Sequence, residues 1–143
     1  MRRFVAAALL LACGASAALA ADVIKDRQEM MKGVQAATKD ATAIAKGTVP
    51  FDAAKVKTIL AVYSDAAAKI PGLFPKGTET GSDTTAAPTI WTDAAGFKLA
   101  AAKLGTDAKA AGAATDQASF AIAFGAITKD CGGCHGTYRV KKD

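Results

Sequence analysis

The sequence predicts an all-α protein folded as an antiparallel four-helix bundle. In four segments, apolar residues recur at steps of three and four, which is the spacing of one helix face. Alanine, the residue with the highest helix propensity, is abundant throughout. No segment shows the alternating pattern of a strand. Four amphipathic helices joined by short connections and one long loop are typical of such a bundle.

The first two predicted helices span residues 22–46 and 52–70. Asp22 can cap the first helix and Gly47 can end it, whereas Pro71 ends the second. The apolar stripe of the first helix consists of Val23, Met30, Val34, Ala37, Ala41 and Ile44. The buried face of the second consists of Val56, Ile59, Leu60, Tyr63 and Ala67.

Residues 71–88 contain many prolines and glycines and predict the long connection. A third helix is predicted over residues 89–111, and a fourth is capped by Thr115 or Asp116. The inner face of the third consists of Trp91, Ala94, Phe97, Ala101 and Leu104. The fourth carries Phe120, Ala123, Phe124, Ile127, Cys131, Cys134 and Tyr138 at helical spacing.

The first twenty residues have the layout of a cleaved secretory signal. Two arginines follow Met1, residues 4–12 form an unbroken apolar run, and Ala18-Leu19-Ala20 ends the segment with small residues. The apolar run is too short to anchor the chain across a bilayer. We therefore expect cleavage after Ala20, export to the periplasm, and one domain over residues 21–143.

Removing this segment changes the charge and the cysteine count. The chain has 18 basic and 13 acidic residues, and loss of Arg2 and Arg3 leaves 16 basic residues and a formal charge of +3. Opposite charges are interspersed as on a solvated helical surface, so no nucleic-acid partner is expected. Cys13 leaves with the signal, unless Leu10-Leu11-Ala12-Cys13, which loosely resembles a lipoprotein processing site, directs a lipid to that cysteine.

The segment Cys131-Gly132-Gly133-Cys134-His135 predicts covalent attachment of one haem c. In a C-x-x-C-H segment, both thiols form thioethers with haem and the histidine supplies an axial imidazole to the iron. A structural zinc site would need four ligands, more than the two cysteines and one histidine of the exported chain readily supply. A thioredoxin-like dithiol would follow a strand in a βαβ pattern, which is missing here.

A second axial ligand from this chain must come from earlier in the sequence, because only eight residues follow His135. It cannot be a histidine unless a second chain contributes one, because His135 is the only histidine. Met30 and Met31 lie on the first predicted helix, and a thioether from either could bind iron and raise its reduction potential. Both could instead fill gaps in the core. The helical pattern alone places Met30 on the packing seam and Met31 on its flank.

The sequence resembles the class II c-type cytochromes, the family that includes cytochrome c-prime. The resemblance covers the whole exported chain and rests on Val23-Ile24-x-x-Arg27-x-x-x-Met31-Lys32 and on Cys131-x-x-Cys134-His135-x-x-Tyr138-Arg139. Leu73-Phe74-Pro75 and Pro88-x-Ile90-Trp91 are similar to the low-spin branch, cytochrome c-556. In that branch a methionine near the place of Met31 binds iron, whereas in cytochromes c-prime an apolar lid covers a five-coordinate iron.

The resemblance implies haem near one end of the bundle, bound by the last helix and covered by the first. It implies His135 and Met31 as axial ligands, unless Met31 only covers the iron. Arg27 and Arg139 are expected near a propionate or the iron pocket, with a solvated surface charge as the alternative. Trp91 and Phe124 are expected at the ring edge, with core packing as the alternative, and Tyr138 completes the expected haem pocket.

The sequence therefore predicts a periplasmic carrier of single electrons whose partners are redox proteins. No enzymatic activity is expected, because no group is placed for acid–base work and the sole histidine is committed to iron. The alternative is a five-coordinate protein that binds nitric oxide or carbon monoxide at an open iron face. The resemblance also implies a homodimer through the first two helices as an option.

Overall fold

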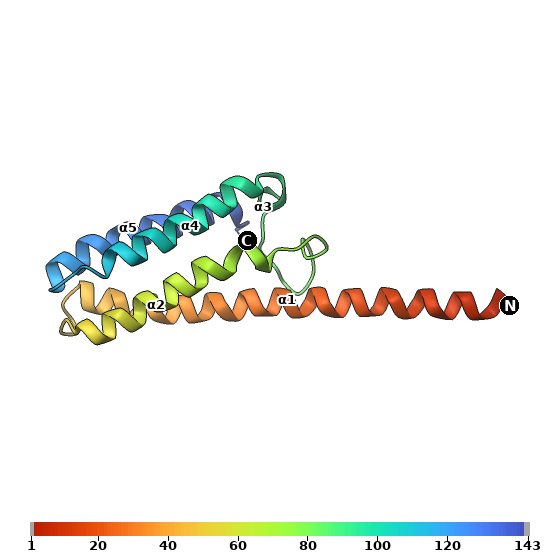
Figure 1. The fold of residues 1–143 in the computed structure, drawn as a ribbon, viewed down its shortest axis with the longest axis horizontal. Helices are drawn as coiled ribbons and strands as arrows, with labels where there is room; N and C mark the ends of the chain where they lie inside the picture. Colours follow the sequence, from red (N-terminus) through yellow and green to blue (C-terminus); the bar gives the residue numbers. More distant parts are fainter. Residues whose placement is uncertain (1, 142–143) are drawn as a thin grey trace.

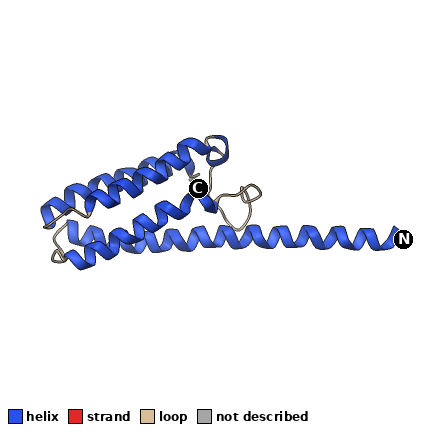
Figure 2. Cartoon of the chain, viewed as in Figure 1, coloured by secondary structure: helices blue, strands red, loops and turns tan. Residues whose placement is uncertain are grey.

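The computed structural model describes residues 2–141, with side chains from Ala20 onward. Its helices are α1 (Arg2–Ala45), α2 (Ala53–Lys69), the 3-10 helix η1 (Ile70–Leu73), α3 (Thr89–Thr92), α4 (Ala94–Ala111) and α5 (Gln117–Tyr138). The four long helices form a bundle in which α1 packs on α2 and α5, and α4 packs on the same two helices (Figure 1). Over the described residues the chain is helical with connecting loops and contains no strand (Figure 2), which confirms the predicted fold class.

Helix α1 is longer than the predicted helix because it begins at Arg2 rather than near residue 22. Its first turns project past the bundle as a continuation of the same helix (Figure 1). It ends as predicted near Gly47, whose φ of 72° reverses the chain and whose N–H donates to the carbonyl of Ile44 at 3.0 Å. The cleavage after Ala20 and the alternative lipid site at Cys13 stay predictions.

The core confirms most of the predicted apolar faces. The predicted buried residues of α2 all lie in the interior, and Phe120 and Ile127 of α5 are fully buried. In α1 the second half of the stripe is buried as predicted, but near its start Ile24 and Arg27 are buried and Val23 is only half-buried. At the end of the bundle where the cavity described below opens, the buried stripe of α1 is therefore displaced by one residue from the predicted stripe.

The predicted third helix is in fact two helices, α3 and α4, separated at Asp93. This residue has φ −124° and ψ 55°, outside the helical range, and its carboxylate accepts a hydrogen bond from the Gly96 N–H at 3.1 Å, which caps α4. The prediction that Ala94 is buried was wrong: it lies in the first turn of α4 and is exposed. Phe97 and Ala101 are buried as predicted.

The long connection between α2 and α3 is fastened to the end of α5. The Ala87 N–H donates to the carbonyl of Tyr138 at 3.1 Å, and the Val140 N–H donates to the carbonyl of Thr85 at 2.9 Å. Helix α5 begins at the second of the two predicted caps, because the carboxylate of Asp116 accepts from the Ser119 N–H at 2.8 Å. Among the described residues, no helix is both long enough and apolar enough to span a membrane.

Candidate functional site

A cavity of about 510 Å³ lies between α1 and α5 at the end of the bundle that holds η1 and α3. This volume is within the range of pockets that hold cofactors. Its apolar wall consists of Val34, Ile70, Phe74, Ala86, Ile90 and Phe97. Its other lining residues include Arg27, Met30, Met31, Thr38, Cys131, Cys134, His135, Tyr138 and Arg139.

Helix α5 presents both thiols and the imidazole to this cavity. Cys131 and Cys134 are free, half-buried, and three positions apart in the sequence, so both face the same side of the helix. Burial raises the pKa of both thiols, and the negative charge of Asp130 adds to this for Cys131. Burial lowers the pKa of His135, and the positive Arg139 lowers it further.

Helix α1 presents the two methionines. Met30 and Met31 are both half-buried and both line the cavity. The helical pattern had separated them into seam and flank, but the cavity is wide enough to include both positions. The cavity is therefore lined by thioether side chains from α1 on one side and by two thiols and an imidazole from α5 on the other.

Arg27 is buried, with 5% of its surface exposed, so of the two alternatives for this residue the solvated surface charge is contradicted. Its guanidinium donates to the Thr78 carbonyl and to the Thr84 hydroxyl, each at 2.8 Å, and to the Thr78 hydroxyl at 3.1 Å. It also lies 4.5 Å from the centre of the Phe74 ring, a cation–π distance. Burial lowers the pKa of Arg27, and Glu79 partly opposes this.

Arg27 therefore does two things in the fold. It fastens the connection between α2 and α3 to α1, and it places a positive charge on the cavity wall. Arg139 lies on the same cavity at the far end of α5, but its side chain is exposed.

The three aromatic residues that the sequence nominated differ in position. Tyr138 is buried and lines the cavity, whereas Trp91 and Phe124 are absent from its lining. The Trp91 indole N–H donates to the Phe74 carbonyl at 3.0 Å, so it supports a wall residue from behind. Phe124 stacks on Phe120 in the bundle core, with ring centres 5.8 Å apart.

Phe74, Ile90 and Ile70 also lie on the cavity wall, although no sequence pattern predicts a site role for them. Phe74 packs edge-on against Phe97, with ring centres 5.0 Å apart. Phe74 lies in an irregular connection, where helical periodicity gives no signal. Only its place beside a proline in the motif Leu73-Phe74-Pro75 could have drawn attention to it.

The Tyr138 hydroxyl donates to the carboxylate of Asp93 at 2.8 Å. This carboxylate raises the pKa of Tyr138. The hydrogen bond therefore stabilises the fold at pH values below the ordinary tyrosine pKa of about 10, and this stabilisation is lost as the pH rises above the raised pKa.

We expect Tyr138→Phe to lower the urea midpoint at pH 7, and the difference from the parent protein to vanish at strongly alkaline pH. A pH-independent difference would contradict this; Asp93→Asn, which keeps an acceptor but removes the charge, is the control.

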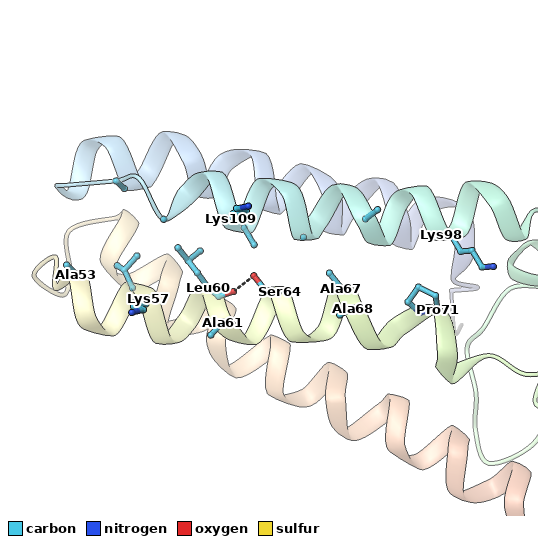
Figure 3. Close-up of a pocket in the computed structure, with 16 residues that line it drawn as sticks. Ala53, Lys57, Leu60, Ala61, Ser64, Ala67, Ala68, Pro71, Lys98 and Lys109 are labelled. Carbon is cyan, nitrogen blue, oxygen red and sulfur yellow. Dashed lines mark hydrogen bonds between the residues drawn. The ribbon is translucent and has the colours of Figure 1, made fainter.

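A second cavity of about 990 Å³ lies between α2 and α4 (Figure 3). Alanine and glycine make up most of its lining, together with Leu60, Ser64 and three lysines, Lys57, Lys98 and Lys109. None of the residues that the sequence predicted for the site lies on it.

The cavity between α1 and α5 fits haem by the chemistry of its donors and by its apolar wall. Two thiols spaced as in C-x-x-C-H can attach haem c covalently, and the adjoining imidazole and a thioether from the facing helix are iron ligands that c-type haem uses. These donor residues, on a cavity at one end of a four-helix bundle, are typical of a c-type cytochrome with a helical-bundle fold.

The chain belongs to the cytochrome c-prime family, because the family model described as Cytochrome C′ matches residues 22–139. It is 47% identical to a cytochrome c-556 from Agrobacterium fabrum over 96% of this chain and 95% of that protein. Its fold is similar to that of cytochrome c′ from Rhodopseudomonas palustris, with a TM-score of 0.81 and 41% identity over 85% of this chain and 98% of that one.

A nitric oxide complex of a cytochrome c prime variant from Alcaligenes xylosoxidans is a further structural relative, with a TM-score of 0.74 and 33% identity. The alignment covers 84% of this chain and 95% of that chain. Proteins of this family bind covalently attached haem c, so the predicted family and cofactor are confirmed. The relatives carry both the c-556 and the c-prime names.

Proposed function

We propose that this protein is an exported carrier of single electrons in which Cys131 and Cys134 attach the haem and His135 and Met31 bind its iron. The observation that carries this proposal is the single cavity that both α1 and α5 line with these side chains. Haem c supplies an iron that alternates between the ferric and ferrous states. No residue is assigned a catalytic role.

Each group of residues on the cavity has a separate task. The two thioethers fix the position of the cofactor against α5, and His135 supplies the imidazole on that side. Val34, Ile70, Phe74 and Phe97 exclude water, which lowers the local dielectric and favours the less charged state of the site. A neutral thioether ligand also favours ferrous iron and raises the potential.

Met31 is favoured over Met30 because it lies four residues after Arg27, near the place where the resemblance to the low-spin branch implies an iron-binding methionine. Adjacent helical residues point about 100° apart, so the two methionines approach the cavity from different directions. The high identity to a protein named cytochrome c-556 supports the low-spin assignment.

The second candidate function is gas binding. The nitric oxide complex of a relative supports it, because that protein has a similar fold and a third of its residues are identical. In this case Met31 would only cover the iron, and nitric oxide or carbon monoxide would bind on the α1 side. The partners of the proposed carrier are redox proteins. Carrying electrons does not require the homodimer through α1 and α2.

The periplasm is the proposed location. The layout of residues 1–20 supports export, and haem c proteins of this kind act after export. Cleavage after Ala20 is part of this proposal.

Met31→Ala is expected to convert a low-spin spectrum to a high-spin one, because the iron loses its sixth ligand. The measurement is the visible spectrum of the purified protein, including the band for charge transfer from methionine to ferric iron. Met30→Ala is the matched control, since it removes an adjacent half-buried thioether from the same helix and should leave the spectrum low-spin.

The parent protein separates the two candidate functions before any substitution. A high-spin spectrum that shifts readily with carbon monoxide would contradict the carrier and support gas binding. If the parent protein is low-spin and its spectrum is unchanged by Met31→Ala but altered by Met30→Ala, the iron ligand is Met30 instead of Met31.

A further inference from the structure

Asp130 is a buried carboxylate next to the haem-attachment segment. It lies on α5 directly before Cys131, and only 5% of its side chain is exposed. Its Oδ1 atom pairs with Lys103 Nζ on α4 at 2.7 Å. Its Oδ2 atom is buried and has no hydrogen-bond partner among the described residues.

Lys103 is shared between two carboxylates. Its Nζ atom also lies 2.6 Å from Asp107 Oδ2, one helical turn further along α4. The side chains of Lys103 and Asp107 are 61% and 21% exposed, so water screens both of them better than it screens Asp130. With two carboxylates and one ammonium, the cluster keeps one negative charge, and the poorly solvated part of it is Asp130.

Stability does not account for this arrangement. An ion pair with one exposed partner contributes little net free energy, because water screens the ammonium while the buried carboxylate loses its own hydration, and an oxygen that is buried without a partner is a cost. An apolar residue in the contact between α4 and α5 would avoid that cost. The position of Asp130 beside Cys131 offers a different role.

We propose that the buried carboxylate of Asp130 lowers the reduction potential of the haem, because its negative charge stabilises ferric over ferrous iron. This inference rests on the proposed attachment at Cys131, which puts one attachment sulfur on the residue of α5 directly after Asp130. The charge acts through the low-dielectric contact of α4 and α5, where screening is weak. It opposes the rise in potential that a methionine ligand and a dry cavity produce.

The field of Asp130 reaches the attachment sulfur. After burial itself, the negative charge of Asp130 is the next cause that raises the pKa of the Cys131 thiol. The other charged groups of the cluster, Lys103 and Asp107, both lie on α4 and are more solvated. Lys103 thus offsets part of the field but does not neutralise the cluster.

The test is the midpoint potential of the holoprotein, measured by spectroelectrochemistry at two salt concentrations. Asp130→Asn keeps the shape and removes the charge, so the midpoint should shift to a more positive potential. Asp107→Asn is the matched control: it removes a charge from the same lysine, but at a more solvated position further along α4. Its shift should be smaller and should shrink with added salt, whereas the shift from Asp130→Asn should persist.

A purely structural role gives a different pattern. It would move the urea midpoint of Asp130→Asn and leave the potential unchanged, and that result would overturn the proposal, as would a more negative potential. Asp130→Ser is a second neutral variant in case the asparagine amide perturbs folding, and it must shift the potential in the same direction.

Failure of the proposed function is recognised separately. The visible spectrum of each variant reports the axial ligands, and haem retained after denaturation reports the attachment. A high-spin parent protein would refute the methionine ligand and leave the comparison of potentials valid.

Discussion

Replacing both Cys131 and Cys134 with serine is expected to leave no haem on the denatured polypeptide. A thioether survives unfolding, whereas an axial imidazole releases the cofactor when the fold is lost. The serine hydroxyls are nearly isosteric with the thiols, so the effect isolates the covalent bonds. The measurement is acid–acetone extraction, followed by haem staining of the protein on a denaturing gel.

The single variants and a distant cysteine provide the controls. Cys131→Ser and Cys134→Ser each keep one thiol and should retain part of the covalent haem. Cys13→Ser should retain all of it, and an unchanged mass after that substitution would also exclude a lipid at Cys13. Extraction of all haem from the parent protein would refute attachment through either cysteine.

Arg27→Met is expected to lower the free energy of unfolding by about 3 kcal/mol, because hydrogen bonds from a charged donor are worth roughly 1.5–3 kcal/mol each and several are lost together. The methionine fills a similar volume but leaves the Thr78 carbonyl and the Thr84 hydroxyl without their donor. Urea unfolding measures the loss. Faster proteolysis within residues 74–88 should accompany it, because this connection loses its main contact with α1.

Gln28→Ala is the matched control for this effect. Gln28 is the next residue of α1 and donates to the Ser82 carbonyl in the same connection, but the contact is exposed. Its loss should change the free energy of unfolding by less than about 0.5 kcal/mol. Equal effects of the two substitutions would show that burial of the guanidinium is not the cause.

The fold could be predicted because helix periodicity and the breakers agree along most of the chain. The buried face of α2 and the Asp116 cap of α5 follow from local pattern alone. The interruption at Asp93 was not predicted: its carboxylate caps α4 through the Gly96 N–H and also accepts a hydrogen bond from Tyr138, a residue distant in sequence. A single helix over residues 89–111 satisfies the pattern equally well without that contact.

The candidate site was predictable on one wall and less so on the other. The spacing of Cys131, Cys134 and His135 carries its own chemistry. Arg27 was named, but its burial depends on Thr78 and Thr84, in a connection that has no periodic signal. Trp91 was expected at the ring edge, but no local rule distinguishes a residue that lines a cavity from one that supports its wall.

The projecting start of α1 has a consequence for maturation. Among the side chains that the structure describes, the first buried residue of α1 is Ile24, followed by Arg27, and both lie after Ala20. A protease that cuts after Ala20 would thus remove no described buried contact. The buried residues described for α1 would therefore be the same before and after such a cut.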